Sequence, residues 1–61
     1  MQEKFKIGEE VTLNGRHENW YRIFQSGEKV KIVNSYVCYQ VEDESGIPLD
    51  SLTENDLSKI E

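Results

Sequence analysis

Cysteine, histidine and proline are scarce in this sequence, with one residue of each among 61. A single cysteine cannot form an internal disulfide, so the fold needs no oxidising compartment. No apolar run approaches the roughly 20 residues of a membrane span, and no charged-then-apolar leader resembles a signal peptide. We therefore expect one small cytoplasmic domain over residues 1–61, without a membrane segment.

Basic residues are also few, because seven Lys and Arg stand against twelve Asp and Glu, for a net charge of −5. The imbalance is confined to the C-terminal part: residues 1–37 carry a net charge of +1 and residues 38–61 carry −6. An acidic chain is disfavoured as a general ligand of DNA, RNA or anionic lipid, which reward Lys and Arg. Hydrophobic residues make up 36% and include six aromatics, enough for one small core.

Patterns for catalysis and metal binding are missing. The only histidine and cysteine, His17 and Cys38, could form a thiolate dyad, but nothing in the sequence brings them together, and an unpaired cysteine in a β-rich run usually packs as a small hydrophobe. One His and one Cys cannot complete a structural zinc site in a monomer. Residues 43–54 have the length of an EF-hand loop, yet Ile47 and Pro48 stand where that loop needs an oxygen ligand and a glycine. We expect no enzyme, no catalytic residue, no cofactor and no metal.

Alternating apolar residues predict a strand over residues 5–13 that could bend at Gly8. Its inward-facing positions would be Phe5, Ile7, Val11 and Leu13. Asn14-Gly15 then signals a tight turn. The stretch that follows, residues 16–28, is ambiguous, because Trp20–Phe24 fits either a short strand or one flank of a long irregular loop.

The clearest pattern lies in residues 29–42, where two alternating apolar runs flank Asn34-Ser35 and predict an antiparallel hairpin. The apolar positions of the two runs are Val30, Ile32, Val37, Tyr39 and Val41. Residues 43–46 form the next turn, and residues 47–49 resume a short strand. Pro48 has no N–H to donate, so it should lie on an edge or at a strand start.

The C-terminal tail carries a helix-start signal. Thr53 is a suitable N-cap, and Asp56 follows three residues later, as in a capping box. The pair that would form a hydrophobic staple around them is Leu52 and Leu57. These residues predict a single helical or 3₁₀ turn, after which residues 58–61 add a last strand with Ile60 pointing inward.

The order of strand, long loop, hairpin, short strand, helical turn and terminal strand is similar to that of small SH3-like β-barrels. Residues 27–32 (Gly-Glu-Lys-Val-Lys-Ile) resemble the start of a strand in many bacterial and phage SH3-like domains. Residues 39–46 and 52–57 resemble their Tyr-x-Val-x-x-x-x-Gly and Glu-x-Asp-Leu ending. The resemblance covers residues 5–60 and implies an all-β, five-stranded SH3-like barrel with one short 3₁₀ turn before the last strand. Such barrels bind peptides, nucleic acids or other subunits, so the likeness does not fix a function.

Aromatic residues are the main candidates for a binding surface. Two or three of the six must fill the core, and the candidates are Phe5, Tyr39 and one of Trp20 or Phe24. Aromatics left exposed would be natural anchors for a partner protein, and we expect these to be Trp20, Tyr21 and Tyr36. The alternative is that the same three cover the ends of the barrel. Acidic residues would add a charged contact set, made of Glu42, Glu44 and Asp56.

These features predict a small non-enzymatic protein–protein interaction module of a bacterium or phage, monomeric or weakly dimeric through its Pro48 edge. A first alternative is an acidic mimic of nucleic acid that inhibits a DNA- or RNA-binding enzyme, since alternate strand residues such as Glu42 and Glu44 lie about 6.7 Å apart on one face. A second alternative is direct nucleic-acid binding by a basic and aromatic face, although the net charge makes nucleic acid an unlikely partner. The basic residues of that face would be Arg16, Arg22, Lys29 and Lys31.

Overall fold

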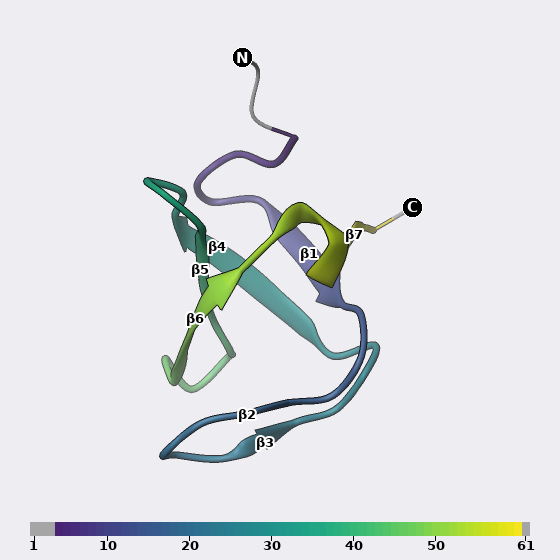
Figure 1. Ribbon diagram of the computed structural model, residues 1–61, viewed down its shortest axis with the longest axis vertical. Helices are drawn as coiled ribbons and strands as arrows, with labels where there is room; N and C mark the ends of the chain where they lie inside the picture. The colour runs from purple at the N-terminus through teal and green to yellow at the C-terminus, as the bar shows by residue number, and fades with distance from the viewer. Residues whose placement is uncertain (1–3, 61) are drawn as a thin grey trace.

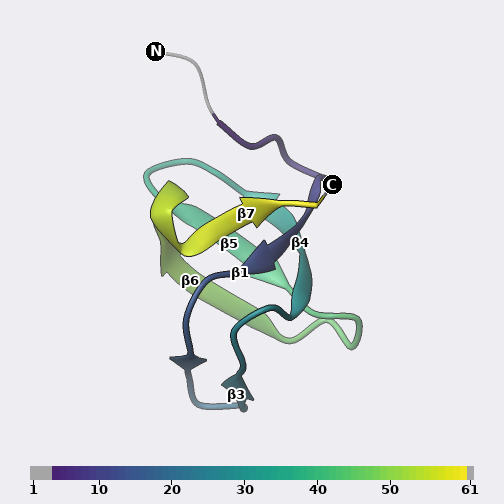
Figure 2. The same cartoon turned by 90° about the vertical axis from the view of Figure 1, so that its right-hand side faces the viewer.

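The computed structural model describes residues 4–60. Its strands are β1 (Glu10–Leu13), β2 (His17–Glu18), β3 (Ile23–Phe24), β4 (Lys29–Asn34), β5 (Tyr39–Glu42), β6 (Pro48–Leu52) and β7 (Leu57–Lys59), and one 3₁₀ turn, η1, spans Glu54–Asp56. The main sheet is antiparallel, with the order β6-β5-β4-β1-β7. The β2–β3 pair forms a separate hairpin that projects from one end of this sheet (Figures 1 and 2).

The predicted all-β class and the single 3₁₀ turn before the last strand are confirmed, and the main sheet has five strands, but two further strands form the separate hairpin. Closure into a barrel is not shown, because β6 and β7 are both edge strands and no ladder joins them within residues 4–60. The chain passes from one edge to the other through η1, so the two edges are linked by the backbone rather than by strand pairing.

The core consists of ten buried apolar side chains, contributed by every strand of the main sheet, by β3 and by the N-terminal segment. Phe5 and Phe24 are fully buried, whereas Tyr39 is partly buried and packs against the cluster. The Phe5 and Tyr39 rings meet edge to face at 5.5 Å, and the Phe5 N–H donates to the Tyr39 hydroxyl at 3.2 Å. Of the two residues that the sequence left open for the third aromatic position, Phe24 occupies the core and Trp20 does not.

The expected strand over residues 5–13 is wrong in its first half. Gly8 has a φ of +92°, which interrupts the two-residue alternation, and β1 begins only at Glu10. The turn is held by the Gly8 N–H, which donates to the Ile32 carbonyl at 2.7 Å. As a result Ile7, which was expected on the buried face, is exposed.

The base of the β2–β3 hairpin is fixed to the end of β1. The Leu13 N–H donates to the Glu28 carbonyl, and the Gly27 N–H donates to the Leu13 carbonyl, at 3.0 and 2.8 Å. At Asn14-Gly15 the chain bends, with a Gly15 φ of +81°, but it does not form the predicted tight turn and runs on into the hairpin. The Ser58 hydroxyl donates to Asn14 Oδ1 at 2.8 Å, which links this exit point to β7.

The predicted β4–β5 hairpin is confirmed, but its second strand is shorter than expected. β5 begins at Tyr39, so Val37 and Cys38 lie in the connecting loop and are exposed. The loop turns at Asn34, whose Oδ1 accepts a hydrogen bond from the Tyr36 N–H at 3.1 Å. Val37 therefore lies outside the alternating strand to which it was assigned, and the expectation that Cys38 packs as a small hydrophobe is wrong.

The β5–β6 turn agrees with the sequence. Asp43 Oδ1 accepts hydrogen bonds from the N–H groups of Ser45 and Ile47, each at 2.9 Å, and Gly46 has a φ of +84°. Pro48 is the first residue of β6, and β6 is an edge strand, so both predicted positions for a residue without an N–H are met.

A bulge in β6 was not predicted. Leu49 and Leu52 are three residues apart, yet they pair with residues of β5 that are only two apart, so Asp50 and Ser51 together oppose Gln40. Ser51 takes the extra position with a φ of +64°. Strict alternation would place the two leucines on opposite faces, and the bulge lets both enter the core.

The C-terminal turn follows the prediction. Asp56 Oδ2 accepts hydrogen bonds from the Thr53 N–H at 2.9 Å and from its hydroxyl at 3.1 Å. The leucines of the predicted staple are both buried: Leu52 and Leu57. The last strand, however, ends at Lys59 and turns Leu57 inward, which leaves Ile60 partly exposed instead of buried. Glu61 lies outside the described residues.

Candidate partner-binding surface

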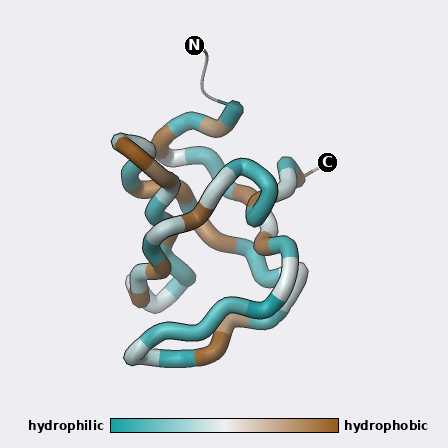
Figure 3. The backbone as a smooth tube through the Cα atoms, viewed as in Figure 1, coloured by the Kyte–Doolittle hydropathy of each residue, from teal (hydrophilic) through white to brown (hydrophobic). Residues whose placement is uncertain are grey.

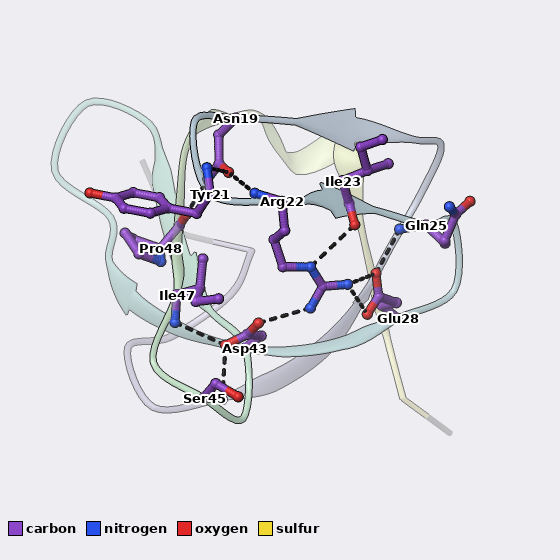
Figure 4. Close-up of polar contacts among 10 residues, drawn as sticks. All are labelled: Asn19, Tyr21, Arg22, Ile23, Gln25, Glu28, Asp43, Ser45, Ile47 and Pro48. Atoms are coloured by element: carbon purple, nitrogen blue, oxygen red, sulfur yellow. Dashed lines mark hydrogen bonds and ion pairs between the residues drawn. The ribbon is translucent and has the colours of Figure 1, made fainter.

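The β2–β3 hairpin ends in a turn over residues 19–22 that the Asn19 side chain organises (Figure 4). Asn19 Oδ1 accepts hydrogen bonds from the backbone N–H groups of Tyr21 and Arg22, at 2.9 and 3.0 Å. Its Nδ2 donates to the carbonyl of Pro48 at 2.5 Å. The Asn19 amide thus sets the shape of the turn and also attaches it to the start of β6.

Arg22 holds the same hairpin from below (Figure 4). Its Nη2 contacts both carboxylate oxygens of Glu28 at 2.6 Å, and its Nη1 donates to Asp43 Oδ2 at 2.8 Å. Its Nε donates to the Ile23 carbonyl at 3.2 Å, and the guanidinium lies 4.3 Å from the centre of the Phe24 ring. One side chain therefore connects the hairpin to the start of β4 and to the β5–β6 turn.

These contacts favour the charged form of each partner. The hydrogen bond from Arg22, followed by the Gln25 N–H, lowers the pKa of the Glu28 carboxyl. For Asp43 the largest cause of the lowered pKa is the Ile47 N–H, and Arg22 adds to it. Glu28 and Asp43 in turn raise the pKa of the Arg22 guanidinium. All three groups are consequently charged at neutral pH. The ion pairs of Arg22 with Glu28 and Asp43, which we call the Arg22 clamp, therefore persist there.

The two residues at the tip of this turn, Trp20 and Tyr21, face solvent. Trp20 is 100% exposed and Tyr21 is 69% exposed. In Figure 3 most of the hairpin has a hydrophilic colour, so the figure does not reveal that the hairpin carries exposed aromatic side chains. We call these two residues the hairpin tip. The structure thus places two of the three predicted aromatic anchors side by side in the chain, on a turn whose backbone is fixed.

The third predicted anchor, Tyr36, lies elsewhere. It is 91% exposed in the β4–β5 loop, beside Val37, which is 86% exposed. β4 starts next to the hairpin and ends at this loop, so the loop and the hairpin lie at opposite ends of the sheet (Figure 1). The structure therefore does not bring Tyr36 together with the hairpin tip.

The three predicted acidic contacts are also dispersed. Glu42 is half-buried on β5, opposite Lys31 of β4, and Glu44 is exposed in the β5–β6 turn. Asp56 belongs to η1, and its carboxylate is engaged with Thr53. Glu42 pairs with Pro48 at the start of β6, whereas η1 follows Leu52 at its end, so Asp56 lies at the other end of this strand pair and the three carboxylates do not form one set.

Three of the four residues of the predicted basic face have acidic neighbours. Lys29 Nζ lies 3.7 Å from Glu10 Oε2, and Lys31 stands between Glu10 and Glu42 in the strand register. Arg22 is already bound to two carboxylates. A shallow hollow of about 350 Å³ on this face is lined by four carboxylates and two lysines, so the surface is mixed in charge rather than basic.

His17 and Cys38 are not brought together. His17 lies in the hairpin, where its Nε2 is 3.1 Å from the Asn14 carbonyl oxygen and 3.9 Å from Asp56 Oδ1. Cys38 lies in the loop at the other end of the sheet. Within the described part of the chain, no three His, Cys, Asp or Glu side chains are placed to hold a metal ion.

Sequence reasoning missed the structural roles of Asn19 and Arg22. Asn19 could have been noticed, because asparagine side chains commonly accept hydrogen bonds from backbone two residues on. Arg22 offers no such local signal, since Asp43, one of its partners, lies 21 residues away. In the sequence, Arg22 is a candidate only for the basic face of the nucleic-acid alternative.

Comparisons with protein families, curated proteins and solved structures find no match to this chain. In the region that the structure describes, no helix is long and apolar enough to cross a membrane.

Proposed function

We propose that this protein is a non-enzymatic binding module that recognises another protein through its hairpin tip. The proposal is supported chiefly by one observation: Trp20 is fully exposed at a turn that Asn19 and Arg22 hold in place. Tryptophan and tyrosine are enriched among the residues that dominate protein interfaces. Because the turn is fixed before binding, little conformational entropy is lost when a partner covers it.

We also propose an SH3-like architecture for the domain. Five strands, a long insertion between the first and second strands of the sheet, and a 3₁₀ turn before the last strand support it. In this view the β2–β3 hairpin is the long insertion, and it carries the recognition residues. The bacterial or phage source and the cytoplasmic location stay predictions of the sequence.

A tagged pull-down from nuclease-treated bacterial lysate tests the binding role, with washes at low and high salt. We expect a protein retained at both salt concentrations, and its loss with Trp20→Ala. Tyr36→Ala is the matched control, because it removes an equally exposed aromatic from the opposite end of the sheet. Retention of the same protein by Trp20→Ala, or no retained protein at all, would contradict the proposal.

The same experiment separates the two alternatives. A nucleic-acid enzyme retained only at low salt, and lost with Glu42→Gln plus Glu44→Gln, would favour the acidic mimic. Direct binding of DNA or RNA would instead show a salt dependence that Lys29→Ala and Lys31→Ala reduce. The acidic neighbours of the two lysines and the dispersed carboxylates give neither alternative the support that the hairpin tip gives to protein binding.

A further inference from the structure

Two acidic side chains without partners lie on the hairpin and on the turn that it contacts. Glu18 of β2 pairs with Ile23 in the hairpin register, so it lies on the face opposite Asn19 and Arg22. Glu44 lies in the β5–β6 turn, where it lines a hollow together with Arg22. Both are exposed, and neither has an ion pair or a side-chain hydrogen bond with any of residues 4–60. These two carboxylates are consequently available to a partner.

Arg22, the arginine of the hairpin turn, is not available. All three guanidinium nitrogens of Arg22 already donate hydrogen bonds, to Ile23, Asp43 and Glu28. Lys29, which lines the neighbouring hollow with Arg22 and Glu44, pairs with a glutamate of β1. The hollow beneath the hairpin is lined by two basic residues, Arg22 and Lys29, and by three carboxylates, those of Glu28, Asp43 and Glu44, so acidic groups outnumber basic ones there.

The aromatic rings of the tip suit the same kind of ligand. A cation over the face of tryptophan or tyrosine is attracted by the ring quadrupole, and tryptophan binds best. The apolar stems of lysine and arginine can cover the rings while their charged ends remain near water. An aromatic pair with unpaired carboxylates on the two sides of the hairpin thus offers both apolar and ionic contacts to a basic segment.

We propose that the segment bound at the hairpin tip is cationic: an exposed stretch of another protein that contains arginine or lysine, packs its apolar stems on Trp20 and Tyr21, and pairs with Glu18 and Glu44. The proposal rests on the proposed function and specifies its partner. Charge argues against the other occupants, since nucleic-acid phosphates would be repelled, and a second copy of this chain has a net charge of −5.

Trp20 is the only tryptophan of the chain, so its fluorescence reports directly on this site. The probes are three synthetic peptides that share a Leu and Gly framework and differ only in having Arg, Gln or Glu at their polar positions. We expect the Arg peptide to change Trp20 emission and to bind about tenfold or more tightly than the Gln peptide, and the Glu peptide to bind more weakly than either. Affinity for the Arg peptide should fall as salt rises.

The deciding variant is Glu18→Gln plus Glu44→Gln. We expect it to weaken the Arg peptide about three- to tenfold, as for two exposed ion pairs, and to leave the Gln peptide unchanged. The matched control is Asp50→Asn plus Glu54→Gln, which removes the same charge from exposed positions on β6 and η1 and should change neither affinity. All four carboxylates are solvent-facing, so both double variants should fold.

Equal binding of the Arg and Gln peptides, or equal weakening by the control variant, would overturn the cationic partner and leave the proposed function standing. Absence of binding by every peptide would also overturn the cationic partner. The proposed function is decided separately, by the pull-down with Trp20→Ala. A change of Trp20 emission with protein concentration alone would assign the tip to a second copy of the chain and exclude the cationic segment.

Discussion

Two ends of this small sheet display aromatic side chains to solvent, and they differ in what lies beneath them. At one end Trp20 stands on a turn held by hydrogen bonds from Asn19 and by the ionic clamp of Arg22. At the other end Tyr36 is nearly as exposed, in a loop where its N–H donates to Asn34 Oδ1. Exposure alone would rank the two ends equally as binding sites. The support under the hairpin is what separates them.

The largest expected effect on stability is the difference between Phe24→Ala at the hairpin end and Val37→Ala at the loop end. Phe24 is buried beneath the Arg22 guanidinium, and removing a buried phenylalanine costs about 3–5 kcal/mol. A chain of this length has only about 3–9 kcal/mol of stability in total. Urea unfolding should therefore show that Phe24→Ala loses a large part of the free energy of unfolding. Val37→Ala should stay within about 0.5 kcal/mol of the original protein. Comparable losses for both would remove the distinction between the two ends.

A second test breaks the clamp but keeps the tip. Arg22→Met leaves Trp20 in the chain and removes every hydrogen bond of the guanidinium. We expect partner affinity to fall roughly tenfold because the turn must then be ordered on binding. Faster hydrogen exchange at the Tyr21 and Arg22-position amides should accompany the loss. Asn34→Ala, made in the other loop, should leave both readouts unchanged.

The clamp also predicts an acid-sensitive stability. Because Glu28 and Asp43 have a lowered pKa in the folded protein, the unfolded chain binds protons first as the pH falls. Their stabilising effect is present above the ordinary carboxyl range and is lost progressively below about pH 4. Thermal unfolding between neutral and acid pH should show this decline. Glu28→Gln and Asp43→Asn should each flatten it, whereas a steep decline retained in both variants would locate the acid sensitivity outside the clamp.

The smallest effect concerns the loop end. Ser51 lines the hollow beside Tyr36 and holds a φ of +64°, which a serine adopts at a cost. Ser51→Gly should relieve that strain and raise the free energy of unfolding by up to about 1 kcal/mol. Part of this gain is offset because glycine increases the conformational entropy of the unfolded chain. Denaturant titration measures it. An unchanged or lower stability would mean that the serine side chain compensates for its backbone.

Much of the fold could be predicted from local patterns. Alternation located β4 and the inward face of Val41, and the spacing of Thr53 and Asp56 located η1. The errors arose where one residue breaks the alternation. The left-handed backbone of Gly8 put Ile7 outside, and the bulge in β6 brought two leucines of unlike parity to one face.

The candidate site was predicted only in part. The exposure of Trp20 and Tyr21 was expected and is found, although their role as anchors stays a prediction. What distinguishes them from Tyr36 depends on Arg22, whose contact with Asp43 joins two turns far apart in sequence. Neither composition nor spacing reveals a contact of this kind, because it exists only after the sheet has formed.

The bulge in β6 has a consequence for how the molecule behaves in concentrated solution. An open sheet edge can template the addition of further strands, and repeated addition leads to fibrils. An incoming strand would meet no N–H at Pro48 and would lose its register at Ser51, where the backbone is not extended. The other edge, β7, is three residues long and ends in Lys59. Both edges of the sheet are therefore poor templates for fibril growth.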